Sequence, residues 1–271
     1  MKKTASIILA AGRGSRMKEF DGNKTLMPLI SVKSQYEGSH PILLEVLSNL
    51  PCEKIVIVIN HKKEDVIKAT HGIGITYIEQ SRLNGTGGAL LAARPFLEGQ
   101  DYEQLIITMG DVPFVKKTTY MSLVNNLKGK SLVVLGFRPE LKKQYGVLEI
   151  EGDNVKRIIE WKYWKAYSQE KQKSFQICNS GIYAARKEDL LRYLLVLASR
   201  PHKVHKKIDG KIKEVEEFFI TDLIEYMHND GLSVGYVIAE DEEEVMGIDD
   251  LDALLSAQEI YRTKFPVDIH N

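Results

Sequence analysis

Cysteine is nearly absent from this chain of 271 residues and occurs only at Cys52 and Cys178. Two cysteines are too few for a disulfide framework or a cysteine-rich zinc module, and such low usage is typical of a reducing compartment. An excess of charge is also missing, because 37 Lys and Arg balance 37 Asp and Glu. A dedicated nucleic-acid-binding protein normally carries a basic excess. The composition therefore argues against a nucleic-acid partner and leaves room for a local cationic pocket that binds a small anion.

Long hydrophobic runs are missing as well. No stretch of about 18 uninterrupted apolar residues occurs, so no membrane span is expected. The first eleven residues resemble a short signal peptide, but their apolar part is at the lower limit for one and a glycine-rich segment follows at once. We interpret residues 5–10 as a buried strand and expect a cytoplasmic protein.

Short β-branched runs alternate with amphipathic stretches over the first 140 residues. The runs predict strands at Ala5–Ala10, Lys54–Ile59, Leu105–Met109 and Ser131–Gly136. The stretches between them predict helices at Ile42–Leu50, Glu64–Thr70, Gly87–Phe96 and Thr118–Leu127. Strands that alternate with helices predict an α/β fold with a Rossmann-like, mostly parallel sheet and helices on both faces.

The pattern changes after about residue 140, where a smaller α+β lobe that covers the substrate is expected. A hairpin is predicted at Gly146–Ile150 and Val155–Ile159, and the basic segment Ser199–Lys213 is predicted to be an exposed, mobile loop. The remaining predictions are strands at Gln176–Ala184 and Ser233–Ile238 and helices at Glu188–Ala198, Phe218–Met227 and Asp249–Tyr261. No internal repeat or linker occurs, so we expect one domain over residues 1–271.

A glycine-rich segment follows the first predicted strand directly. Gly12 and Gly14 let the backbone turn tightly and come close to a ligand. Backbone N–H groups in such a turn can bind phosphate oxygens, and Arg13 and Arg16 add charged donors. A dinucleotide fingerprint would place a third glycine at position 17, which is Met, and the Gly-Lys-Ser/Thr of a P-loop is absent. The segment fits a phosphate-binding turn of another kind, or a plain turn with solvated arginines.

The glycine-rich segment and the residues after it together resemble a known family. Leu9-x-x-Gly12-x-Gly14-Ser15-x-Met17, followed by Lys24 in a Lys-x-Leu-x-Pro segment, resembles the nucleotidyltransferases that join a nucleoside monophosphate to a sugar-1-phosphate. Further motifs of that family occur in its order: Gln80 with Asn84–Ala89, Gly110–Pro113, Tyr145–Val147, Ile159–Lys162, Asn179–Tyr183, Glu217–Asp222 and Gly247–Asp249. The late motifs are most similar to the uridylyltransferase domain of the bifunctional uridylyltransferase/acetyltransferase that makes UDP-N-acetylglucosamine. The resemblance covers about residues 5 to 260.

The sequence departs from the family pattern at four points, of which the first two are mild. Ser15 stands where the family usually has Thr, and Asn23 stands where it usually has Pro. Asp249 stands where the bifunctional enzyme has Asn as a metal ligand, although other sugar nucleotidyltransferases have Asp there. The 271 residues contain no hexapeptide repeats, so we do not expect the acetyltransferase activity.

The resemblance implies a reaction, a cofactor and a set of site residues. A sugar phosphate oxygen would attack the α-phosphorus of an NTP with the help of Mg²⁺ and release pyrophosphate, a reaction that needs positioning and charge neutralisation more than acid–base chemistry. The implied catalytic residues are Arg16, Lys24 and Asp111, and the implied Mg²⁺ ligands are Asp111 and Asp249. The implied nucleotide-binding residues are Leu9, Ala10, Ala11, Gly12, Gly14, Gln80, Gly85 and Thr86. The implied sugar-binding residues are Gly146, Glu160 and Asn179, with Lys162 and Thr221 as weaker candidates.

The resemblance also implies the nucleotide-diphospho-sugar transferase fold and a division of labour. A nucleotide-binding core is expected at about residues 1–140, a sugar-binding lobe at about 141–248 and a C-terminal helix at 249–271. The expected partners are an NTP and a sugar-1-phosphate, without nucleic acid or a membrane, and the sequence is compatible with a homo-oligomer.

Structural alternatives exist for several of these residues. Asp111 could form an Asx turn before Pro113, and Asp249 could cap a helix at 250–257 with Asp252 in its first turn. The Gln80 amide can donate and accept, so it suits uracil and cytosine alike.

Three functions remain compatible with the sequence. The first is a uridylyltransferase for N-acetylglucosamine-1-phosphate or a related sugar phosphate in nucleotide sugar biosynthesis. The second is a cytidylyltransferase for another sugar phosphate or a phospho-alcohol. The third is a nucleotide-sugar sensor without turnover, which would not need both Asp111 and Asp249.

Overall fold

The computed structural model describes residues 3–14, 16–17, 19–99, 101–208 and 210–265. Its strands are β1 (Thr4–Leu9), β2 (Pro28–Ser34), β3 (Glu37–Pro41), β4 (Lys54–Ile59), β5 (Thr76–Glu79), β6 (Gln104–Met109), β7 (Leu132–Phe137), β8 (Val147–Glu151), β9 (Asn154–Ile159), β10 (Cys178–Arg186), β11 (His202–Ile208), β12 (Lys211–Glu217) and β13 (Val234–Ile238). Its α-helices are α1 (Ile42–Asn49), α2 (Lys63–Ala69), α3 (Thr86–Glu98), α4 (Lys117–Asn125), α5 (Trp161–Trp164), α6 (Gln169–Ser174), α7 (Lys187–Ala198), α8 (Thr221–Asn229) and α9 (Leu251–Lys264), and its 3-10 turns are η1 (Lys24–Leu26) and η2 (Glu242–Val245).

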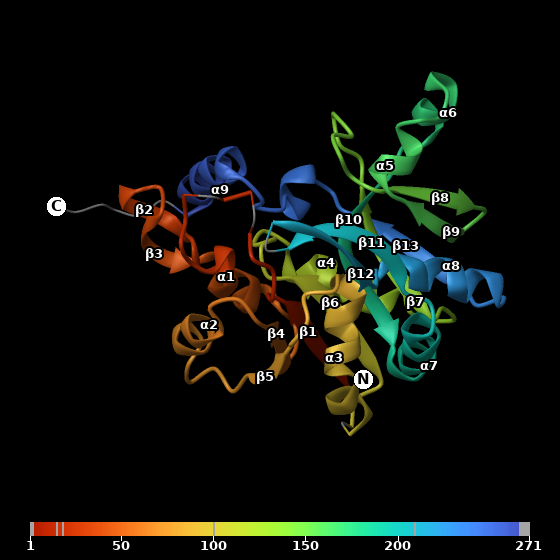
Figure 1. Cartoon of the computed structure of the whole chain (residues 1–271), viewed down its shortest axis with the longest axis horizontal. Helices are drawn as coiled ribbons and strands as arrows, with labels where there is room; N and C mark the ends of the chain where they lie inside the picture. Colours follow the sequence, from red (N-terminus) through yellow and green to blue (C-terminus); the bar gives the residue numbers. More distant parts are fainter. Residues whose placement is uncertain (1–2, 15, 18, 100, 209, 266–271) are drawn as a thin grey trace.

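A central mixed sheet has the strand order β13-β7-β10-β6-β1-β4-β5. Its pairs are parallel except those that β10 makes with β6 and β7. The β8–β9 hairpin joins β10 at the pair Cys178↔Val147. The predicted mostly parallel α/β sheet is confirmed, and so is the predicted hairpin after residue 140 (Figure 1).

Helices cover both faces of this sheet, because alternate strand residues point to opposite sides. In β1, Ile7 packs with the core under α3, α7 and α8, whereas the neighbouring Ile8 packs with the core under α1, α2 and α4. Both side chains are fully buried. Because β1 pairs in parallel with both β4 and β6, the three strands end at one shared edge of the sheet. Ligands bind at this edge in open α/β sheets.

The last helix packs against the start of the chain. Helix α9 shares a core with the β2–β3 hairpin, a hairpin that the sequence did not predict. The Gln258 amide, which is buried, donates to the backbone carbonyls of Pro28 at 2.8 Å and Gln35 at 2.9 Å. This packing brings the segment before α9 back to the carboxyl edge of the sheet.

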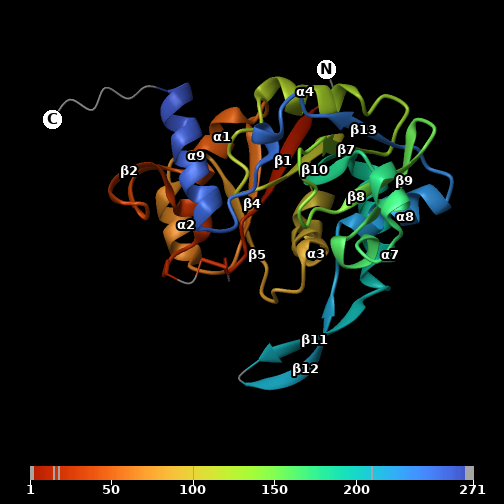
Figure 2. The same ribbon diagram turned by 90° about the horizontal axis from the view of Figure 1, so that it is seen from above.

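The prediction of a mobile loop at Ser199–Lys213 is wrong. The segment forms β11 and the start of β12, paired in antiparallel register from His202↔Glu217 to Ile208↔Lys211. Figure 2 shows this hairpin extending away from the rest of the molecule. The many lysines favoured a loop, but side chains on an extended backbone alternate between the two faces of a hairpin, where Lys203, Lys206, Lys211 and Lys213 are exposed.

Candidate functional site

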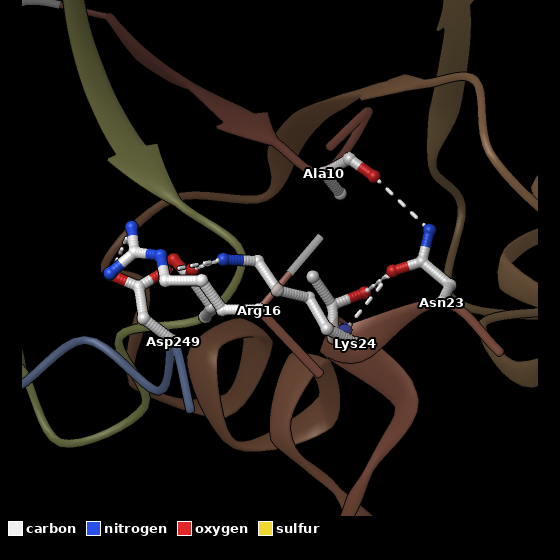
Figure 3. Close-up of polar contacts among 7 residues, drawn as sticks. Ala10, Arg16, Asn23, Lys24 and Asp249 are labelled. Atoms are coloured by element: carbon white, nitrogen blue, oxygen red, sulfur yellow. Dashed lines mark hydrogen bonds and ion pairs between the residues drawn. The ribbon is translucent and has the colours of Figure 1, made fainter. Parts of the chain in front are cut away.

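Lys24 lies at the carboxyl edge of the sheet, on the 3-10 turn η1. Its neighbour Asn23 is 1% exposed and anchors this turn, because its side-chain amide donates to the carbonyls of Ala10 at 3.2 Å and His61 at 2.8 Å. Oδ1 of the Asn23 side chain accepts from the backbone N–H and the hydroxyl of Thr25. Asn23 therefore ties Lys24 to the ends of β1 and β4 (Figure 3).

Two carboxylates converge on the Lys24 ammonium group. Lys24 Nζ donates to Asp111 Oδ2 and, at 2.9 Å, to Asp249 Oδ1, and Arg16 Nη2 lies 3.4 Å from Asp249 Oδ2 (Figure 3). Burial opposes the charge of Lys24, but the two carboxylates outweigh it and raise its pKa. Burial likewise opposes the charge of Asp249, but Lys24 and Arg16 lower its pKa below the ordinary value. Lys24 and Asp249 are thus held in their charged forms.

The position of Asp249 excludes the alternative that it caps a helix. The N-cap of α9 is Asp250, whose carboxylate accepts from the N–H of Ala253 at 2.9 Å. The backbone N–H of Ile248 donates to the carbonyl of Asp111 at 2.9 Å, which fixes the segment before Asp249 beside the end of β6. The Asp249 carboxylate is therefore free of a capping role and faces Lys24.

Asp111 and Asp249 fit a hard divalent cation. Their oxygens already meet at one cationic nitrogen, and Mg²⁺ in proteins is commonly held by one or two carboxylates together with waters and phosphate oxygens. Among the described residues, no group of three or more His, Cys, Asp or Glu side chains forms a metal cluster. A cation here would take its remaining ligands from the substrate and water.

The glycine loop packs beside Lys24. Gly14 has a φ of +59°, and a Cβ there would lie 3.2 Å from Cβ of Lys24, so a side chain would strain the turn. Gly12 is exposed and has open space around it, while Ala10 and Ala11 are buried at the end of β1. Leu9, the last residue of β1, pairs with Met109 of β6. Ser15 lies outside the described residues.

Gln80, Gly85 and Thr86 belong to one ordered loop. The Gln80 side-chain amide donates to Asn84 Oδ1 at 3.1 Å and to the Gly85 carbonyl at 3.0 Å. Gly85 has a φ of +93°, and a Cβ there would lie 2.3 Å from the Phe218 carbonyl oxygen. The hydroxyl of Thr86 accepts from the N–H of Ile220 at 3.3 Å. Gln80 therefore shapes the loop with its amide nitrogen. Its side-chain carbonyl oxygen is the atom left to contact a base.

A cavity of about 920 Å³ lies beside this loop, and its lining includes two of the three predicted sugar-binding residues, Glu160 and Asn179, but not Gly146. Its lining includes Thr86, Glu160, Asn179 and Thr221, and also Met109, two residues before Asp111. The Thr221 hydroxyl donates to Glu160 Oε1 at 3.3 Å, and burial raises the pKa of Glu160 above its ordinary value despite this bond. The cavity therefore adjoins the end of β6 that carries Asp111.

Gly146 and Asn179 are tied to one another beside the cavity. The N–H of Asn179 donates to the carbonyl of Gly146 at 2.8 Å, and a Cβ at Gly146 would lie 3.0 Å from Ile158. The Asn179 side chain donates to the Tyr183 hydroxyl at 3.0 Å and accepts from the N–H of Gly181 at 3.1 Å. These bonds hold the amide at an irregular part of β10.

Several cavity residues escaped the sequence analysis. Lys162, a weaker candidate, does line the cavity, but so do the unpredicted side chains of Tyr163, His202 and Asp222. His202 stands out in the sequence only by its spacing from His205. Its place in the cavity depends on how the β11–β12 hairpin joins α8, for which no local sequence signal exists.

No helix among the residues described here has the length and apolar character needed to cross a membrane.

Known proteins share the sequence pattern of this chain. A family model described as a MobA-like NTP transferase domain matches residues 6–163, more than half of the chain. The bifunctional protein GlmU of Ruegeria pomeroyi is 30% identical over an alignment of 266 residues. The alignment covers 96% of this chain and 53% of that protein. The chain spans about half the length of the curated relatives it matches.

Solved structures share the fold. The uridine diphosphate N-acetylglucosamine pyrophosphorylase of Trypanosoma brucei superposes with a TM-score of 0.74 at 12% identity, covering 94% of this chain and 65% of that one. A 4-diphosphocytidyl-2C-methyl-D-erythritol synthase from Anaerococcus prevotii superposes with a TM-score of 0.61 at 17% identity, covering 96% of this chain and 99% of that one. At such identities the likeness concerns the fold alone.

Proposed function

Because the chain belongs to the family of MobA-like NTP transferase domains, we propose that it transfers a nucleoside monophosphate from an NTP to a sugar-1-phosphate and releases pyrophosphate. The observation that carries this proposal is the convergence of Asp111 and Asp249 on Lys24 at the end of β6, beside a cavity lined by Glu160 and Asn179. Cations for phosphates and acceptors for sugar hydroxyls thus lie next to each other.

The chain's own residues supply positioning and charge in this reaction. Lys24 and Arg16 neutralise the triphosphate, while the backbone of Gly12 and Gly14 approaches the phosphates. Asp111 and Asp249 hold Mg²⁺, which when bound polarises the phosphoryl oxygens. Glu160 accepts from sugar hydroxyls, and Asn179 is held for a further sugar contact by its bonds to Gly181 and Tyr183.

UTP is the nucleotide that we propose. The Gln80 amide nitrogen is engaged by Asn84 and Gly85, so the side chain meets a base through its carbonyl oxygen. A carbonyl oxygen accepts from the N3–H of uracil, whereas cytosine could meet it only through its N4 amino group, because N3 of cytosine is itself an acceptor. The shared fold of the uridine diphosphate N-acetylglucosamine pyrophosphorylase and the polar lining of the cavity support N-acetylglucosamine-1-phosphate or a related sugar phosphate as the proposed acceptor.

We further propose that about residues 1–140 bind the nucleotide and about 141–248 bind the sugar. The predicted nucleotide-binding residues lie in the first range and the predicted sugar-binding residues in the second. Asp249 follows both ranges in sequence but contacts Lys24 of the first.

The test is a screen of four NTPs against a panel of phosphorylated sugars and alcohols with Mg²⁺, measured as pyrophosphate release. We expect release with UTP and an N-acetylhexosamine-1-phosphate, and loss of release in Asp111→Ala. Release with CTP and a phospho-alcohol would support a cytidylyltransferase instead. Silence across the panel combined with tight binding of a nucleotide sugar would support a sensor.

A further inference from the structure

The base of the β11–β12 hairpin contributes a side chain to the cavity. His202, the first residue of β11, lines the same cavity as Glu160 and Asn179, although the rest of the hairpin extends away from the molecule (Figure 2). The hairpin thus reaches the proposed acceptor site at its base.

His202 is held in a defined orientation. Its Nε2 lies 2.8 Å from Asp222 Oδ2, and its ring centroid lies 5.2 Å from that of Phe219. The His202 side chain is 41% exposed, whereas that of Asp222 is 20% exposed. One edge of the imidazole is therefore fixed by a carboxylate and a ring, while part of it stays open to the cavity.

Asp222 is itself fixed beside the proposed sugar contacts. Its N–H donates to the carbonyl of Phe219 at 3.2 Å, and the preceding residue, Thr221, donates to Glu160. Burial raises the pKa of Asp222, and the neighbouring His202 opposes that shift. The pairs His202–Asp222 and Thr221–Glu160 consequently form one continuous polar strip along the cavity.

We propose that His202, oriented by Asp222, determines acceptor specificity by accepting a hydrogen bond from a hydroxyl of the sugar ring. The inference rests on the proposed function, because it assigns the contact to the acceptor of that reaction. With Nε2 engaged by Asp222, the ring contacts the hydroxyl through Nδ1. A bond to a group held in this way is specific, because an acceptor without the hydroxyl leaves the imidazole unpaired.

His205 provides a matched control on the same strand. It lies three residues further along β11, so its side chain points to the other face of the hairpin, and it pairs in register with Glu214. It is exposed, and substituting it removes a histidine from the hairpin without touching the cavity.

The experiment compares the full-length chain with His202→Ala, His202→Gln, Asp222→Asn and His205→Ala in steady-state pyrophosphate release. We expect His202→Ala to raise the KM for the acceptor about 10-fold, the effect typical of one lost hydrogen bond in a site. Its KM for the NTP, its kcat and its Tm should stay close to those of the unsubstituted chain. His202→Gln should recover part of the loss, Asp222→Asn should raise the acceptor KM in the same way, and His205→Ala should have no effect.

Two outcomes would overturn this inference and leave the proposed function standing. One is an acceptor KM in His202→Ala equal to that in His205→Ala. The other is an equal rise in the KM for the NTP and the acceptor, which would mark a structural role. If the unsubstituted chain releases no pyrophosphate and binds no sugar phosphate in calorimetry, the proposed function fails and the inference fails with it.

Discussion

Lys24 is the central positive charge of the site, since it donates to both proposed metal ligands. Substituting it by Met should lower the rate of nucleotidyl transfer about 10²- to 10³-fold, as for the loss of one preorganised charge-stabilising donor. The same change leaves Asp111 and Asp249 facing one another with only the exposed Arg16 as a counter-charge. The Tm in EDTA should therefore fall and recover when Mg²⁺ is added.

The control for this prediction is Lys63→Met, which removes a surface lysine paired with Glu79 at 2.6 Å. Exposed pairs of this kind contribute little to stability. Equal rates in Lys24→Met and Lys63→Met would show that Lys24 has no part in the reaction.

Cys178 gives a prediction about pH. Its side chain is fully buried in β10, and burial raises the pKa of the thiol from 9.0 to about 11. Between these two values the unfolded chain releases a proton at this site while the folded chain keeps it. The unfolded state then binds fewer protons, so stability falls as pH rises, by at most about 3 kcal/mol across the window.

Urea unfolding at pH 8 and pH 10.5 measures this effect. Cys178→Ala leaves a small cavity at both pH values, but the part of the pH dependence that Cys178 causes should disappear. An unchanged loss of stability between the two pH values would contradict the assignment to Cys178.

The family motifs name the four charged residues that meet at the carboxyl edge of the sheet, and their roles stay a prediction. Arg16, Lys24, Asp111 and Asp249 lie together as the family motifs imply. The role of Asn23, which stands out in the sequence only as a departure from Pro, was missed because a buried amide that bonds two distant carbonyls leaves no periodic signal. The sequence also could not show that Gln80 uses its amide nitrogen within the loop.

At the scale of elements, Glu244 joins η2 to the start of α4. It is 1% exposed, and its Oε1 accepts from the N–H of Lys116 at 3.0 Å and from the hydroxyl of Thr119. Glu244→Ala leaves the buried Thr119 hydroxyl and the Lys116 N–H without this acceptor, so the free energy of unfolding should fall by about 1–3 kcal/mol. Because η2 leads directly to Asp249, the apparent affinity for Mg²⁺ should fall as well.

Glu243→Ala is the matched control for this prediction. Glu243 is the preceding residue of the same turn, but it is exposed and pairs only at the surface with Lys264, at 3.4 Å. If the denaturation curves of the two variants coincide, Glu244 does not stabilise the fold through these bonds.

Elements with a regular apolar period were predictable. The strand at Lys54–Ile59 has the predicted bounds, and α1 and α7 differ from the predictions by one residue at one end. The β11–β12 hairpin was missed although Asp209-Gly210, a pair typical of hairpin turns, lies between two runs that contain Val and Ile among charged residues. The density of lysines was given more weight than this turn signal. The β2–β3 hairpin was missed because its solvent-exposed half shows little apolar alternation.

At the scale of the whole molecule, the zero net charge does not mean that charge is evenly spread. Lys24 and Asp249 are 225 positions apart in sequence and are paired in space, and the Gln258 amide ties α9 to the start of β2. The proposed nucleotide site therefore depends on the folding of almost the whole described chain. A ligand that bridges Lys24, Asp111 and Asp249 connects the first strands to the last helix.

Binding of Mg²⁺ and UTP should consequently stabilise the entire fold. A ligand that binds only the native state stabilises it by about 2.7 kcal/mol at 100 times its Kd. For a chain of this size that corresponds to a rise in Tm of roughly 5–10 °C. Calorimetry with UTP alone, Mg²⁺ alone and both together should show the full rise only with both, since the proposed cation would bind the triphosphate as well as Asp111 and Asp249. Asp249→Ala should lose the Mg²⁺-dependent part of the rise, whereas Asp252→Asn, an exposed change in the first turn of α9, should keep it. A Mg²⁺-dependent rise of the same size in Asp249→Ala would show that the C-terminal segment does not take part in the site.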